Sequence, residues 1–416
     1  MSRSTPAAPQ PGYLGGIERP FRARGRPAAG GRSPLAVLFV TVFLDLVGFG
    51  IVIPLLPLYA ERYGAGPVGA AWLLAIYSLM QFLFAPWWGR LSDRVGRRPV
   101  LLVGIFGAAA SYLAFGLAGS LATLFVARAV NGVMGANVGV AQAYIADVTE
   151  PRDRARGMGM IGAAFGLGFI FGPALGGVLS RWGPAAPFVG AAVLAGLNGV
   201  LAWYRLPESL PPESRAAARP ASGLGARLAT VLAAGPRLRR LYLAGFLATL
   251  ALAAVEAIVG LWAARRWNAT AEMVGYGFAI VGVVAAAAQG LMVGPLVRRL
   301  GERRSALLGL GVLAAAMALI PAAPTLPLVV AALALWALGH AAATPAISAM
   351  VSHQGGASEQ GRLLAATQSL YALVRVLGPW GGGVALAHVG LAAPYLGAAV
   401  VALMALAVLA VAEAGS

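Results

Sequence analysis

An aspartate, Asp45, lies within the first long apolar stretch of the sequence, residues 35–60. An ionised carboxylate deep in a membrane-spanning helix costs roughly 2.5–3.5 kcal/mol, so such a residue normally faces a polar cavity or a charged partner. A carboxylate in an apolar setting can also take up and release a proton, and we predict that Asp45 couples the protein to protons. The alternative is a structural role, in which the carboxylate caps a kink beside Gly48, Gly50 and Pro54.

An arginine, Arg128, lies in a later apolar stretch, residues 121–147. A guanidinium group keeps its proton, so inside a membrane it must be paired with an anion or exposed to water. We predict that Arg128 and Asp45 interact electrostatically, and that substrate or a change of conformation competes for this interaction.

Polar side chains elsewhere in the apolar stretches are candidates for a substrate cavity, and several share a helical face with Arg128. They are Gln81, Asn131, Asn137, Gln142, Gln289, Gln368 and Tyr371. Glu256 is the one carboxylate expected inside the membrane in the second half of the chain. It could bind a cationic substrate or a second proton, or it could form a structural pair with Arg375.

A short segment rich in arginine, residues 89–99, separates two apolar stretches and reads GRLSDRVGRRP. Its two glycines permit a tight reversal of the chain, and its one carboxylate lies among four guanidinium groups. Such a carboxylate can accept hydrogen bonds in one conformation and lose them in another. We predict a conformational latch, or gating loop, formed by Gly89, Asp93, Arg94, Gly96, Arg97 and Arg98, with Arg362 in its network.

Glycines recur at short intervals along residues 157–180. A helical face without side chains lets a neighbouring backbone approach closely, and a Gly–Pro pair allows a bend. We predict a sliding interface between two halves of the protein, built on Gly168, Gly172, Pro173, Gly176 and Gly177.

Helices within a lipid bilayer must position all of these residues. The chain of 416 residues is 59% hydrophobic and 11% charged, with a mean hydropathy of +0.79, whereas soluble domains carry about 25% charged residues. Apolar runs of about 20 residues predict membrane-spanning helices and not the alternating strands of a membrane β-barrel. Twelve such runs are present, at 35–60, 68–88, 99–119, 121–147, 157–180, 185–205, 238–262, 273–297, 305–322, 325–350, 362–387 and 391–412.

The connections between these runs suggest the domain organisation. Residues 1–34 have the composition of a disordered basic tail, and residues 207–237 that of a flexible linker between two six-helix bundles, residues 35–206 and 238–416. The net charge of +17 resides in arginines that cluster between the runs, without the interleaved aromatic residues of a nucleic-acid surface. By the positive-inside rule, the tail, the linker and both termini are expected to be cytoplasmic.

The two predicted bundles also share sequence. Residues 89–102 are echoed at 294–308, offset by 205 over their first part, and residues 172–177 are echoed at 378–383, offset by 206. Two copies with an even number of helices each are parallel repeats about an axis along the membrane normal, an architecture typical of transporters. Ala332 corresponds to Arg128 in the second copy, so the arginine is not needed to fold this helix.

These motifs resemble a known family. The pattern G-x-L-x-D-R-x-G-R-R of residues 89–98 is similar to the signature loop of the major facilitator superfamily, and residues 168–177 are similar to its helix 5 antiporter motif. Arg-Ala-Val-Asn-Gly at 128–132 resembles its helix 4 motif. The segments that resemble the tetracycline/proton antiporter branch of the twelve-helix drug:proton antiporters are 44–57, 77–86, 144–149 and 359–362.

The resemblance implies the fold and the mode of action. It implies twelve helices in two pseudo-symmetric bundles, alternating access to a central cavity, and proton coupling at the position of Asp45. The sequence differs from the tetracycline branch before Tyr112, where Ser111 replaces a carboxylate, and at 264–266, where Ala-Arg-Arg replaces an acidic segment. We predict no metal site and no cofactor, with the proton gradient as the energy source.

We therefore predict a proton-coupled exporter of amphipathic drugs, tetracycline-like or multidrug, in the inner membrane and monomeric. A transporter of a metabolite or sugar is the first alternative, although such cargo demands more binding polarity than the cavity candidates offer. A membrane sensor that transports nothing is the second. No nucleophile–base pair or phosphate-binding loop is present in the sequence, so an enzyme is not expected.

Overall fold

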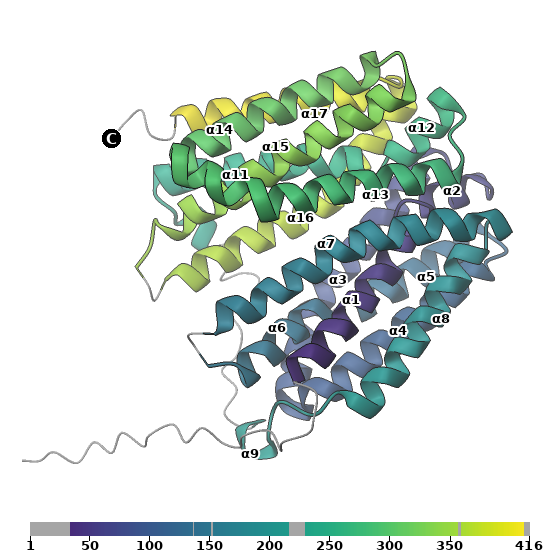
Figure 1. The fold of residues 1–416 in the computed structure, drawn as a ribbon, viewed down its shortest axis with the longest axis vertical. Coiled ribbons are helices and arrows are strands. Elements are labelled where there is room, and N and C mark those ends of the chain that lie inside the picture. The colour runs from purple at the N-terminus through teal and green to yellow at the C-terminus, as the bar shows by residue number, and fades with distance from the viewer. Residues whose placement is uncertain (1–33, 136, 151–152, 216–228, 357–358, 412–416) are drawn as a thin grey trace, which may run out of the picture. The chain divides into compact units, whose positions relative to one another are not determined.

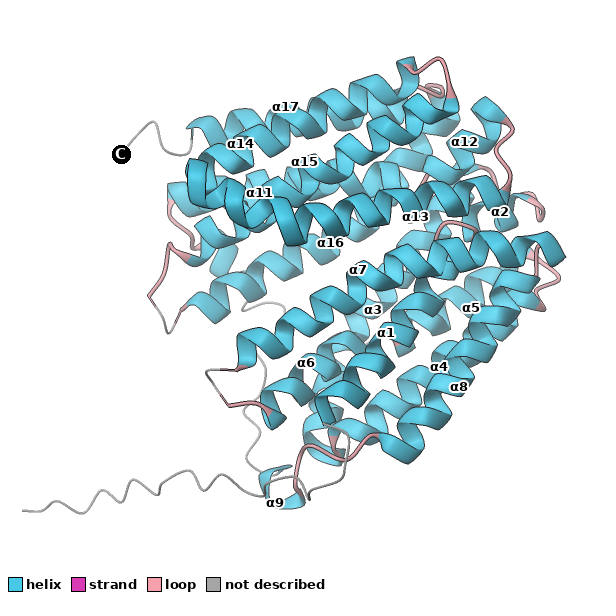
Figure 2. Ribbon diagram, viewed as in Figure 1, coloured by secondary structure: helices cyan, strands magenta, loops and turns pink. Residues whose placement is uncertain are grey.

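The computed structural model describes residues 34–135, 137–150, 153–215, 229–356 and 359–411. Every regular element in these ranges is a helix, as the predicted all-α membrane fold requires (Figure 2). The basic tail up to residue 33 and residues 216–228 of the linker lie outside the described residues, so the predictions made for them stay predictions.

The first half of the chain contains α1 (Pro34–Val52), α2 (Leu56–Glu61), α3 (Pro67–Val95), α4 (Arg97–Gly116), α5 (Leu121–Met134), α6 (Asn137–Val148), α7 (Arg154–Leu179) and α8 (Ala186–Arg205). A short helix, α9 (Pro212–Arg215), follows in the linker. The second half contains α11 (Pro236–Glu256), α12 (Val259–Trp267), α13 (Ala271–Ala287), α14 (Val293–Ala322), α15 (Leu326–Ser352), α16 (Gln360–His388) and α17 (Ala393–Val411). A π-helical turn, Ala288–Met292, joins α13 to α14.

These helices make twelve membrane crossings. Eleven helical segments of the described chain are long and apolar enough to span a bilayer, and one of them, Ala271–Ala322, has 52 residues. At 1.5 Å per residue a straight helix of this length would measure about 78 Å, far more than the hydrocarbon core of about 30 Å. Gly301 breaks it with φ 78° and ψ 164°, so this segment crosses twice.

Two reversals between helices are tighter than the sequence analysis expected. α3 continues through Asp93 to Val95, and the chain turns only at Gly96, whose φ is 109°. The prediction of a loop from residue 298 to 304 was wrong in the same way, because helix surrounds Gly301 on both sides. Each helix was expected to end where its apolar run ends. Backbone hydrogen bonding instead continues into the polar residues that follow; for example, Gly96 N donates to Ser92 O at 3.1 Å.

The internal repeat is visible in the backbone. Gly96 and Gly301, 205 residues apart, both make the turn with a positive φ that a side chain would strain. Pro173 and Pro379, 206 residues apart, both lie inside long helices, α7 and α16. The two bundles therefore have the same internal plan.

Each bundle has its own helix contacts. In the first half α1 packs on α7 and α8, and α4 packs on α5 and α8; in the second half α14 packs on α15 and α17, and α11 packs on α16 and α17. The halves meet where α7 packs on α13, α3 on α16 and α2 on α12 (Figure 1). We call the end of the bundles with Gly96 and Gly301 the linker end, and the opposite end, with α2 and α12, the far end.

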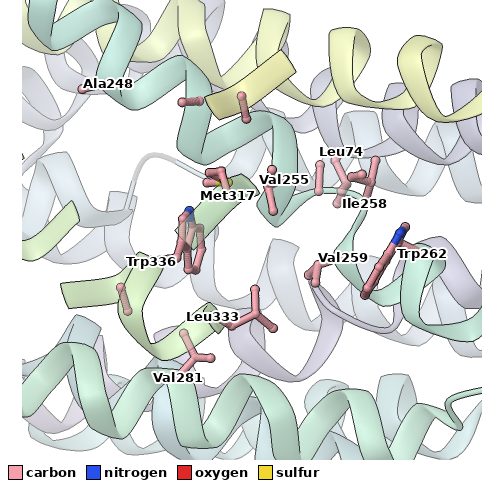
Figure 3. Packing of buried hydrophobic residues seen from close by; sticks show 14 of the residues in the cluster. Leu74, Ala248, Val255, Ile258, Val259, Trp262, Val281, Met317, Leu333 and Trp336 are labelled. Carbon is pink, nitrogen blue, oxygen red and sulfur yellow. The ribbon is translucent and has the colours of Figure 1, made fainter. Parts of the chain in front are cut away.

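The hydrophobic core is continuous across the halves. One cluster of buried residues includes Leu74 of α3 together with Val255, Ile258 and Trp262 of the second half (Figure 3). Large apolar side chains such as Leu197 are exposed on the outside of the bundles, where lipid would cover them.

Candidate functional site in the membrane interior

Asp45 lies in α1, and its side chain is half-buried. Its Oδ2 accepts a hydrogen bond from Nδ2 of Asn137 at 3.3 Å. Asn137 is the first residue of α6, and α5 ends at Met134. The described chain provides no ion pair for Asp45. A carboxylate bonded to a neutral amide keeps unused lone pairs and can accept a proton.

Arg128 in α5 is almost completely buried, with 1% of its surface exposed. Its Nε donates to the backbone oxygen of Leu73 at 3.2 Å, and its Nη1 donates to Oδ1 of Asn131 at 3.3 Å. The guanidinium carbon lies 4.4 Å from the centroid of the Tyr77 ring. A cation over an aromatic ring contributes about 2 kcal/mol when it is desolvated. Arg128 is thus held by neutral groups.

Tyr77 and Tyr112 connect the two charges. Each tyrosine interacts electrostatically with both Asp45 and Arg128. No ion pair joins Asp45 and Arg128 directly in the described structure, and their predicted coupling stays a prediction. No three His, Cys, Asp or Glu side chains of the described ranges are placed to share a metal ion.

The remaining polar candidates of the first half lie at different places. Gln81 of α3 donates from Nε2 to the backbone oxygen of Gly135 at 2.5 Å and to the Tyr77 hydroxyl at 3.3 Å. It therefore ties α3 to the interruption between α5 and α6. Asn131 and Asn137 join the same cluster through Arg128 and Asp45, whereas Gln142 is exposed on α6.

The second half contributes two charged residues. Glu256, at the end of α11, is half-buried, and Arg375 of α16 is exposed. Arg375 interacts electrostatically with Glu256 and with Tyr77 of the first half.

The other candidates of the second half are placed differently. Gln289 and Gln368 are exposed. Tyr371 is buried and packs against α11. Its hydroxyl lies 2.9 Å from the position that a Cβ on Gly245 would take.

The predicted latch forms a charged cluster at the linker end. Arg97 is buried; its Nη1 donates to Asp93 Oδ1 at 2.5 Å, and its Nε donates to Asp147 Oδ2 at 3.0 Å. Glu208, which the sequence analysis did not single out, accepts hydrogen bonds from the backbone N–H groups of Arg97 at 2.8 Å and Arg98 at 3.2 Å. This cluster joins the first half to the start of the linker.

The remaining residues of the predicted latch form no hydrogen bond or ion pair between the halves in the described part of this conformation. Arg98 donates to the backbone oxygen of Trp203 at 2.5 Å, and Arg94 is exposed. Arg362 pairs with Glu359 at 2.8 Å within the second half. The described residues contain no ion pair between Arg362 and Asp93, so their predicted network is not formed here.

Two ion pairs join the halves at the far end. Arg265 of α12 pairs with Glu61 of α2 at 2.6 Å, and Arg181 pairs with Glu272 of α13. Neither pair was predicted from the sequence. A charged residue at the end of each span indicates that an ion pair can form there. Which residues pair depends on which helices meet, and the sequence does not reveal that.

The predicted glycine helix, α7, contacts helices on two sides. A Cβ on Gly172 would lie 2.7 Å from the Gly50 Cα of α1, within the first half. On the other side, a Cβ on Gly177 would lie 3.1 Å from the Glu272 oxygen of α13. The equivalent residue Gly383 faces α3, since its Cβ would lie 2.8 Å from the Pro67 oxygen. Small residues thus bring both bundles together toward the far end.

Comparison with known proteins identifies the family. The sequence model of the Major Facilitator Superfamily matches residues 38–257 and 241–414. Tetracycline resistance protein, class C, from Escherichia coli is 37% identical over 362 residues, which are 83% of this chain and 88% of that protein. The chain belongs to the major facilitator superfamily, and its relatives include tetracycline resistance proteins.

Solved structures agree with this assignment. The human organic anion transporter MFSD10 (TETRAN) superposes with a TM-score of 0.68 at 28% identity, over 90% of this chain and 98% of that chain. The nucleoside transporter NupG superposes with a TM-score of 0.75 at 12% identity, over 92% of this chain and 100% of that chain, which supports the fold alone. The protein is a secondary transporter, not an enzyme, and it lies in a lipid bilayer and moves a small molecule.

Proposed function

We propose that the protein exports amphipathic drugs across the inner membrane in exchange for protons. The observation that carries this proposal is Asp45, a half-buried carboxylate in the membrane interior whose partner is the neutral amide of Asn137. Among the described residues no arginine forms an ion pair with this carboxylate, so its protonation breaks no salt bridge there. Tyr77 and Tyr112 each lie within electrostatic range of both Asp45 and Arg128, so a change in the charge of Asp45 alters the surroundings of these tyrosines.

The proposed cycle alternates between two arrangements of the bundles. The linker end, with its arginine-rich loops, is the cytoplasmic end in this proposal, and both termini are cytoplasmic. In this proposal the Arg265–Glu61 and Arg181–Glu272 pairs hold the far end closed, and the conformation described here corresponds to the inward-facing state. In the outward-facing state Asp45 takes up a proton after drug release, and the protonated form favours the return to the inward-facing state.

The substrate is a small amphipathic molecule, bound without a metal ion, and the transporter works as a monomer with the proton gradient as its energy source. Tetracycline-like drugs are the first candidates, because the relatives include tetracycline resistance proteins. Organic anions are a second candidate, favoured by the exposed Arg375 and by the likeness to an organic anion transporter.

Inverted membrane vesicles test this function. Vesicles with the wild-type protein should accumulate tetracycline or a fluorescent amphipathic dye when respiration acidifies their interior, and an uncoupler should abolish the uptake. Asp45→Asn should lose nearly all proton-driven uptake, because the amide cannot release a proton at this pH. The matched control is Glu213→Gln, which also replaces a carboxylate with its amide but lies exposed on α9 in the linker, and it should keep full uptake. Full uptake by Asp45→Asn would refute the coupling role.

A further inference from the structure

Arg375 differs from the other intramembrane arginine. Arg128 is buried and has two hydrogen-bond acceptors and an aromatic ring. Arg375 lies near the middle of α16 with an exposed side chain, and within the described part of the chain it has neither a hydrogen bond nor an ion pair. A guanidinium at this depth cannot lose its charge, so it needs water or an anion.

The face of α16 on which Arg375 lies follows from the helical periodicity. Gln368 and Arg375 are seven residues apart, two helical turns, and both are exposed on one face of α16. Leu373, Leu377 and Trp380 are also exposed, but they lie on the opposite face. An apolar face suits lipid, and a face with an amide and a guanidinium suits water or a polar ligand.

The surroundings of Arg375 come from both halves. α16 and α11 touch next to it, because a Cβ on Gly378 would lie 2.6 Å from the Cβ of Ala253. Glu256, one turn further along α11, is close enough to interact electrostatically with the guanidinium, but it forms no ion pair with it in the described structure. Tyr77 approaches from the first half. The guanidinium therefore has a carboxylate and an aromatic ring within electrostatic range, and it has unused donors.

We propose that Arg375 binds a negatively charged group of the substrate, such as a carboxylate, and that Glu256 balances the arginine charge when the site is empty. This proposal rests on the proposed transport function and narrows its substrates to amphipathic molecules with an acidic group. The guanidinium fork can grip both oxygens of a carboxylate. The body of the substrate would lie against Tyr77, so that a bound molecule contacts both bundles. Glu256 competes with the substrate for the same guanidinium.

A matched pair of dyes tests the charge preference. Rhodamine 110 carries a free carboxylate, and rhodamine 123 is its methyl ester with the same ring system. Purified wild-type protein should bind rhodamine 110 about tenfold more tightly, the size of effect expected for a charge-assisted hydrogen bond. Arg375→Gln should remove this preference, and Arg375→Lys should retain part of it. Glu256→Gln should tighten the binding of rhodamine 110 several-fold and leave rhodamine 123 unchanged.

The control is Arg205→Gln, which removes an exposed arginine from the last turn of α8. It should leave the preference intact, and thermal unfolding should show all variants folded. The proposal is overturned if the wild type binds the ester as tightly as the acid, or if Arg375→Gln weakens both dyes equally. Failure of the transport function would look different: the acid would bind through Arg375, but proteoliposomes would move neither dye in response to a pH difference.

Discussion

At the scale of single residues, Tyr77 links the charges of the two halves. Its ring lies under Arg128, its hydroxyl accepts a hydrogen bond from Gln81, and it interacts electrostatically with Asp45 and Arg375. Tyr77 is the first residue of segment 77–86, which resembles the tetracycline branch, but no role for this side chain was predicted. A cation–π contact depends on where two helices place a ring and a charge, and a single sequence does not reveal that.

Replacing Tyr77 tests this arrangement. Tyr77→Leu removes the aromatic ring that stabilises the buried Arg128 guanidinium. We therefore expect the free energy of unfolding to fall by about 2 kcal/mol and the thermal unfolding midpoint to be clearly lower. Tyr77→Phe keeps the ring and should unfold within a degree or two of the wild type. Equal midpoints for the two variants would contradict the role of the ring.

At the scale of helices, the contact between α7 and α13 sets how closely the bundles approach. A Cβ on Gly275 would lie 2.5 Å from the Pro173 oxygen, whereas one on Gly277, on the same helix, would meet nothing within 4 Å. Of the α7 residues predicted for an interface between the halves, Pro173 and Gly177 contact α13, whereas Gly168, Gly172 and Gly176 contact the segment around α1 in the first half. The partner glycine Gly275 in α13 was missed, although Gly282, two helical turns further along, also faces α7.

A substitution on α13 can therefore separate the bundles selectively. Gly275→Val should push α13 away from α7 and shift the population toward the arrangement that is open at the far end. Spin labels at exposed positions on α2 and α12 should report longer distances across the far end by electron paramagnetic resonance. Gly277→Val is the matched control and should leave the distances unchanged; the same lengthening in both variants would contradict a specific contact.

At the scale of the whole molecule, the sequence predicted the twelve crossings, the two halves and their repeat, because apolar length and repeated motifs are properties of the chain itself. Helix ends were predicted less well, as Val95 and Arg298 show, since backbone hydrogen bonding continues past the apolar runs. Contacts between the halves, such as Arg265 with Glu61, were not predicted. They depend on how the two bundles are docked in one conformation.

That ion pair gives a prediction for the molecule as a whole. Glu61 and Arg265 are partly exposed, so the pair contributes about 0.5 kcal/mol and less at high salt. Glu61→Arg should shift the population toward far-end opening by roughly twofold to threefold, and the double variant Glu61→Arg, Arg265→Glu should restore the wild-type distances. Failure of the swapped pair to restore them would show that the pair does not hold the far end closed.

The most direct test of the account is whether cargo movement drives proton movement. Purified protein is reconstituted in liposomes that contain a pH-sensitive dye, with no imposed pH difference, and an outward gradient of tetracycline or rhodamine 110 is applied. The account predicts that the interior pH changes in the wild type, in the direction of proton entry as cargo leaves, and that Asp45→Asn shows no change. Cargo that leaves the wild-type liposomes with no change of interior pH would contradict proton exchange at Asp45.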